Sequence, residues 1–119
     1  MYNVAIVGGG PAGIFAALEI TKLKPDWKVI LVEKGVQIEK RKCLLREGLE
    51  KCPSCKKCGL LCGWGGAGAF SDGKLTLTPD VGGHLLDYMS RKSVEDLIKY
   101  TDDTYLKFGA TDEVFGTDK

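Results

Sequence analysis

The chain has 119 residues, a size close to that of one domain, so we expect one hydrophobic core. Its formal net charge of +1 gives no global attraction to nucleic acid, and the expected partner is a small molecule. The first apolar run has no basic leader, and no later stretch is long and apolar enough to span a bilayer, so we expect a cytoplasmic protein that does not enter membranes.

Residues 1–34 have the pattern of a strand, a helix and a second strand. The apolar run Tyr2–Val7 ends at three glycines, which predicts a strand buried on both faces. Pro11 then begins a helix that we expect to run to about Leu23, where the Lys-Pro-Asp sequence ends it. The run Trp27–Val32 predicts a second strand, parallel to the first, because a strand, helix, strand order implies a right-handed crossover.

The glycine turn between the first strand and the helix satisfies the dinucleotide-binding pattern G-x-G-x-x-G. Gly8 allows the tight turn, Gly10 has no Cβ and lets a diphosphate approach, and Gly13 permits close packing of helix on strand. Amides at the helix start would face the diphosphate. The expected cofactor contacts in this turn are Gly8, Gly9, Gly10, Pro11, Ala12 and Gly13.

An acidic residue, Glu33, ends the second strand about 20 positions after the glycine turn. We expect its carboxylate to accept hydrogen bonds from the adenosine ribose, which disfavours the 2′-phosphate of NADP. The spacing does not separate FAD from NAD, because both present the same diphosphate.

The segment that follows is basic, which predicts a solvated positive face. Within it, Ile38–Leu49 predicts a charged amphipathic helix, and a cysteine-rich insert spans residues 43–62. The cations of this segment are Lys34, Lys40, Arg41, Lys42, Arg46, Lys51, Lys56 and Lys57.

Four cysteines stand in the order C-x2-C-x2-C-x3-C, with Cys43 outside the run. This order matches the run that binds a [4Fe–4S] cluster in bacterial ferredoxins, although Gly63 stands where a proline is usual. Zinc is a second interpretation, although it prefers two C-x2-C pairs separated by a longer loop, and reduced thiols without a metal are a third. The expected metal ligands are Cys52, Cys55, Cys58 and Cys62.

Glycine dominates residues 63–74, which predicts a loop whose backbone closely approaches another group. Leu75–Thr78 predicts a short strand. Ser93 predicts the N-cap of a helix that ends before Gly109, within a helical tail spanning residues 82–109. We interpret His84, the only histidine, as a solvated loop residue.

These motifs together resemble flavoproteins. Val4–Gly13 with Val32–Gly35 resembles the opening of FAD-dependent oxidoreductases, and Gly63–Leu75 resembles a bacterial and archaeal family of uncharacterised FAD-dependent dehydrogenases, as does Tyr105–Ala110. In such flavoproteins a second glycine-rich segment approaches FAD from its other side. The resemblance implies contacts from Gly66, Ala67, Ser71, Asp72 and Gly73. We also expect Lys34, which follows Glu33, to contact the cofactor.

We therefore expect an α/β fold, the N-terminal βαβ portion of an incomplete Rossmann-like FAD/NAD(P)-binding domain. The resemblance implies a longer flavin-dependent oxidoreductase in which this segment holds the ADP half of FAD and a missing domain binds the substrate. We expect the fragment alone to be inactive, and no catalytic residue or oligomeric state is predicted. The alternatives are an NAD-binding oxidoreductase domain and a non-catalytic module that binds zinc or an iron–sulfur cluster.

Overall fold

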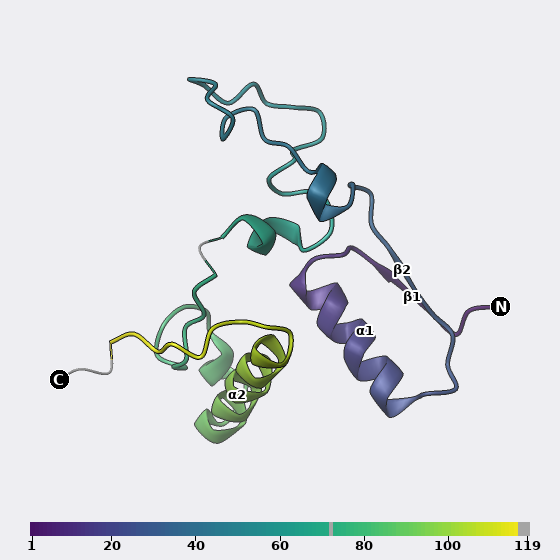
Figure 1. Ribbon diagram of the computed structural model, residues 1–119. Coiled ribbons are helices and arrows are strands. Elements are labelled where there is room, and N and C mark those ends of the chain that lie inside the picture. Colours follow the sequence, from purple (N-terminus) through teal and green to yellow (C-terminus); the bar gives the residue numbers. More distant parts are fainter. Residues whose placement is uncertain (72, 117–119) are drawn as a thin grey trace. The chain divides into compact units, whose positions relative to one another are not determined.

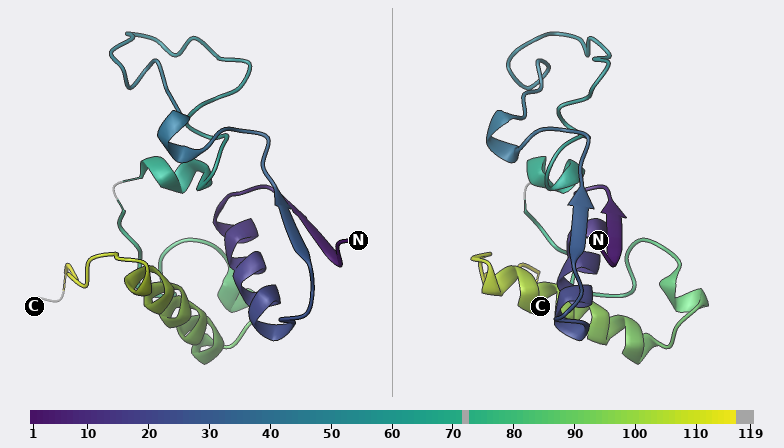
Figure 2. Two further views of the ribbon diagram at one scale, coloured as in Figure 1. Left: turned by 45° about the vertical axis from the view of Figure 1, so that its right-hand side comes forward. Right: turned by 90° about the vertical axis from the view of Figure 1, so that its right-hand side faces the viewer.

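The computed structural model describes residues 1–71 and 73–116. It begins with β1 (Val4–Val7), α1 (Pro11–Leu23) and β2 (Val29–Val32). The two strands pair in parallel, and Figure 2 shows α1 beside them. The predicted strand, helix, strand order is therefore confirmed as a small α/β unit. Where we expected one core, the chain divides into two compact units, Met1–Asp72 and Gly73–Lys119.

The first strand is half-buried on one face and exposed on the other, so the prediction that it is buried on both faces is wrong. Val4 and Ile6 are half-buried, whereas Ala5 is exposed and Val7 is 88% exposed. Alternate side chains of a strand point to opposite faces. Within this unit α1 packs against both strands.

Local signals set both ends of α1, as the sequence predicts. Pro11 occupies the first turn, where its missing amide hydrogen costs no helical bond. At the other end the amide of Lys24 donates to the carbonyl of Ile20 at 2.8 Å, and Pro25 follows. The helix ends there because a residue that precedes a proline disfavours helical geometry.

The prediction of a helix over Ile38–Leu49 is wrong. A single 3₁₀ turn, η1 (Ile38–Lys40), is followed by Arg41 in an extended conformation, with φ −77° and ψ 126°. Arg41 turns its side chain inward, and Gly48 has a φ of 105°, which no helix accommodates. In Figure 1 residues 41–62 run as a long loop that returns to η2 (Gly66–Phe70).

The second unit is built on α2 (Arg91–Lys107), which follows the short turn η3 (Leu85–Asp87). The N-cap is Ser90 and not Ser93, because the Ser90 hydroxyl accepts from the Ser93 amide at 3.2 Å. The predicted end before Gly109 is confirmed, since α2 stops at Lys107. The predicted strand Leu75–Thr78 is wrong, because this unit has no described strand with which it could pair.

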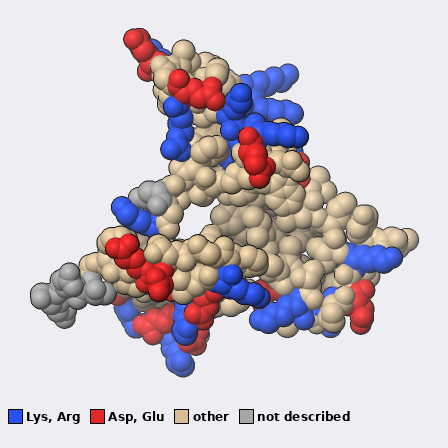
Figure 3. All heavy atoms as spheres, viewed as in Figure 1, with Lys and Arg blue, Asp and Glu red and all other residues tan. Residues whose placement is uncertain are grey.

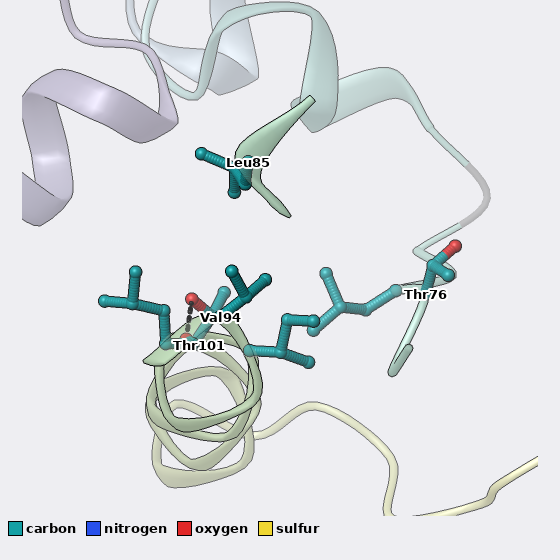
Figure 4. A pocket seen from close by; sticks show the side chains of 7 residues that line it. Thr76, Leu85, Val94 and Thr101 are labelled. Carbon is teal, nitrogen blue, oxygen red and sulfur yellow. Dashed lines mark hydrogen bonds between the residues drawn. The ribbon is translucent and has the colours of Figure 1, made fainter. Parts of the chain in front are cut away.

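An open groove of about 170 Å³ lies on one face of α2. Figure 4 shows Thr76, Leu85, Val94 and Thr101 around it, and Val94 is only 2% exposed. The Thr101 hydroxyl donates to the carbonyl of Leu97 at 2.9 Å, within α2 itself. Most of the residues that line the groove are aliphatic. Among the described residues, no helix has the length and apolar character needed to cross a membrane.

Candidate dinucleotide site

The predicted dinucleotide turn lies at the edge where both strands end. Because β1 and β2 are parallel, Gly8 and Glu33, which follow them, both lie at this edge. The Gly8 amide donates to the carbonyl of Val32 at 2.8 Å, which extends the pairing by one residue. Gly8 has a φ of 108°, a conformation that favours glycine, and the chain turns there toward α1. Its predicted role in the tight turn is confirmed.

The start of α1 offers unpaired backbone amides. Gly10 is the N-cap, and no side chain among the described residues caps the helix. Pro11 has no amide hydrogen, and the amides of Ala12 and Gly13 have no acceptor in the described part of the chain. A Cβ placed on Gly10 would have only the Cα of Gly66 within 4 Å, at 3.9 Å, so the space beside this backbone is open. Such a helix start suits an anion.

Gly13 sets the distance between α1 and β1. A Cβ at this position would lie 2.0 Å from the carbonyl oxygen of Gly8 and 3.4 Å from Cγ2 of Ile6. The first of these separations is far shorter than any contact that a real Cβ makes. The predicted close packing of helix on strand is confirmed, and it requires glycine here.

Three backbone amides hold the carboxylate of Glu33. Oε2 accepts from Gly9 at 2.7 Å, and Oε1 accepts from Gly35 at 2.8 Å and from Gly63 at 3.1 Å. The bonds from Gly9 and Gly35 are the main cause that lowers the pKa of Glu33 below its ordinary value of 4.5, so the group is ionised at neutral pH. A carboxylate has about four acceptor positions. The remaining one, on Oε2, is the position from which Glu33 could accept a ribose hydroxyl.

The second glycine-rich segment, at Gly65 and Gly66, lies directly against the glycine turn that precedes α1. The Gly65 amide donates to the carbonyl of Gly9 at 2.9 Å. A Cβ on Gly66 would lie 3.2 Å from the Cα of Gly10 and 3.3 Å from Cδ of Pro11. The predicted close approach of this backbone is confirmed, and the group it approaches is the start of α1.

The other residues expected to contact the cofactor are less closely tied to this edge. Ala67 is exposed and follows Gly66 in η2, and Ser71 is exposed just after η2. Lys34 is exposed beside Glu33, and its charge makes the smallest contribution to the lowered pKa of that carboxyl. Gly73 belongs to the second unit. Asp72 lies outside the residues that the structure describes.

The thiols of the cysteine-rich insert do not form a metal-binding group among the described residues. Cys52 and Cys55 are exposed, Cys58 and Cys62 are half-buried, and all are free. In the described ranges, which include every cysteine, no three His, Cys, Asp or Glu side chains converge on a possible metal position. The iron–sulfur and zinc interpretations therefore stay predictions from spacing.

The predicted basic face is present, with one exception that the sequence pattern missed. Figure 3 shows Lys and Arg side chains gathered over the loop of residues 41–62. Arg41 is instead buried, at 6% exposure. Apart from its residue type, its local sequence does not distinguish it from the adjacent Lys40 and Lys42, because the groups that bury it come from residues 59–70. The exposed cations of this loop and of the residue before it are Lys40, Lys42, Arg46, Lys51, Lys56 and Lys57.

Comparison with known proteins identifies a relative without an assigned function. An uncharacterized protein of Clostridium beijerinckii is 34% identical over 113 residues, which make up 95% of this chain and 20% of the relative. The chain therefore spans about a fifth of the length of that relative. No family model matches the chain. No solved structure matches it.

Proposed function

We propose that this chain holds the ADP half of FAD, as part of a flavin-dependent oxidoreductase with a Rossmann-like cofactor domain. The observation that carries the proposal is the edge at which the glycine turn, the uncapped start of α1 and the carboxylate of Glu33 meet. Each element offers the chemistry that one part of an adenosine diphosphate requires. The rest of such an enzyme would supply the substrate site.

The diphosphate would rest at the start of α1. The amides of Ala12 and Gly13 would donate to its oxygens, and the helix dipole would add about 0.3–1 kcal/mol of attraction for the negative charge. Gly10 supports this placement, because its backbone is open to close approach and a side chain there would fill the space.

The ribose would lie at Glu33. The carboxylate of Glu33 is ionised and held in place by backbone amides, and its Oε2 keeps one acceptor position. A hydroxyl can donate to that position, whereas a 2′-phosphate would be repelled by the negative charge. This argument favours FAD or NAD over NADP.

The second glycine-rich segment favours FAD over NAD as the resident cofactor. It adds backbone groups beside the start of α1, as expected of a cofactor that stays bound while the flavin accepts and returns electrons. Bound FAD would supply the redox chemistry. Residues of this chain would bind and orient its ADP half. We place the protein in the cytoplasm, where its free thiols would stay reduced.

The first test is titration of the protein with FAD, ADP and NAD, together with the absorption spectrum of the purified protein. FAD and ADP should bind, and the spectrum should show oxidised flavin. Binding of NAD without FAD would favour the alternative cofactor, and failure of all three ligands to bind would reject the proposed site.

Two substitutions locate the site. Gly10→Ala should fold, because Gly10 has a φ of −80° and the new Cβ would have a single neighbour at 3.9 Å. It should weaken FAD at least about tenfold, ~1.4 kcal/mol, by occupying the diphosphate space. Glu33→Gln should also weaken FAD, whereas Glu39→Gln, at an exposed carboxylate, should not. Unchanged FAD affinity in a folded Gly10→Ala variant would refute this placement.

A further inference from the structure

A buried cation contacts the second glycine-rich segment. Arg41 is 6% exposed, although Lys40 and Lys42 on either side are exposed. Within the described residues no carboxylate pairs with it, and its partners are backbone carbonyls and an aromatic ring. A buried charge is costly unless it is fully hydrogen-bonded, so this arrangement requires an explanation.

The guanidinium joins the end of the cysteine-rich insert to the glycine-rich segment that follows it. Nε donates to Gly59 at 3.0 Å and Nη2 to Leu60 at 2.7 Å, both in the cysteine-rich insert. Nη1 donates to the carbonyls of Trp64 and Gly66, each at 2.7 Å. The guanidinium also stacks on Phe70, with its carbon 4.6 Å from the ring centre. Four of its five N–H donors are thus used on backbone carbonyls.

These bonds fix the direction of two peptide groups in the second segment. In a trans peptide the C=O and the following N–H point in opposite directions. Because the carbonyls of Trp64 and Gly66 converge on Arg41, the amides of Gly65 and Ala67 point away from it. The Gly65 amide reaches the carbonyl of Gly9 in the dinucleotide turn. The Ala67 amide has no acceptor among the described residues, and Ala67 is exposed.

We propose that Arg41 is a positioning residue that orients the Ala67 amide as a further donor to the cofactor diphosphate. The inference rests on the proposed function. It adds a donor from the second segment to those of α1, and its geometric basis is the placement of Gly66 against both Gly10 and Pro11. Arg41 does not contact the cofactor. It acts through the Gly66–Ala67 peptide.

Arg41→Lys tests the orientation, because lysine keeps the charge but its compact ammonium cannot reproduce the planar fork that spans these carbonyls. We expect ADP and FAD to bind about tenfold more weakly, equivalent to ~1.4 kcal/mol, while adenosine affinity is unchanged. A merely structural role would weaken adenosine equally. Arg46→Lys is the matched control, since exposed Arg46 donates to the carbonyl of Phe70 and lies 5.4 Å from the same ring.

Ala67→Pro tests the donor directly and serves if Arg41→Lys does not fold. Proline removes the amide hydrogen, and its φ suits the start of a 3₁₀ turn such as η2. It should reproduce the selective loss of ADP affinity. If the wild-type protein binds ADP and folded Ala67→Pro binds it equally well, the role of Arg41 is refuted while the proposed function stands. If the wild-type protein binds neither ADP nor FAD, both proposals fail.

Discussion

Replacement of Gly13 by alanine tests the packing on which the whole site depends. The new Cβ would lie 2.0 Å from the carbonyl oxygen of Gly8. A backbone oxygen cannot move aside by a change of rotamer, so α1 would have to shift away from β1. Overpacking of this kind costs up to about 3 kcal/mol, and alanine recovers about 1 kcal/mol over glycine within a helix. We therefore expect a net loss of about 2 kcal/mol, or roughly 30-fold in the unfolding equilibrium.

Urea unfolding monitored by Trp64 fluorescence measures this loss. Trp64 is a suitable reporter because a Cβ on Gly9 would lie only 3.1 Å from its ring, and Trp27→Phe removes the other tryptophan signal. Gly68→Ala is the matched control, since its new Cβ would have its nearest neighbour at 3.7 Å, an ordinary contact. The control should change stability by no more than about 0.5 kcal/mol. Equal unfolding midpoints for the Gly13 and Gly68 variants would show that the packing argument is wrong.

Three further predictions concern Glu33, the cap of α2 and the cysteines. The lowered pKa of folded Glu33 means that its stabilising contribution is complete above the ordinary value of 4.5 and is lost as the pH falls through the folded value. Urea midpoints measured across that range should therefore fall less steeply in Glu33→Gln, and identical profiles would contradict this. Ser90→Ala should destabilise α2 by about 1 kcal/mol and Ser93→Ala by less than about 0.5 kcal/mol, measured by thermal loss of helical circular dichroism; the reverse order would reject Ser90 as the cap. The cysteine spacing predicts iron and labile sulfide after anaerobic reconstitution, and a product with neither iron nor zinc would exclude both metal interpretations.

The sequence predicts those parts of the fold whose causes lie close together in the chain. Pro11 and Pro25 set the ends of α1, apolar runs form the two strands, and the order of these elements makes the strands parallel. The turn at Gly8 and the close packing at Gly13 follow from the same local pattern. The position of Glu33 at the carboxyl end of β2 also follows from the local sequence.

Features that depend on distant partners could not be read from local patterns. The periodicity of Ile38–Leu49 favours a helix, but Arg41 gains four carbonyl acceptors from residues 59–66 when its backbone is extended. Likewise, the amide of Gly63, which holds Glu33, comes from 30 residues further along the chain. Ser93 has the residue type of a cap, but the backbone places Ser90 at that position.

Opposite charges organise the two loops of the candidate site. Glu33 accepts from three backbone amides, and Arg41 donates to four backbone carbonyls. Among the described residues Val94 is the buried apolar side chain, and it lies in the second unit, so apolar burial contributes less to this site. Contacts near 3 Å are shorter than the screening length of about 8 Å at physiological salt. Both sets of bonds should therefore keep the loop geometry at physiological salt.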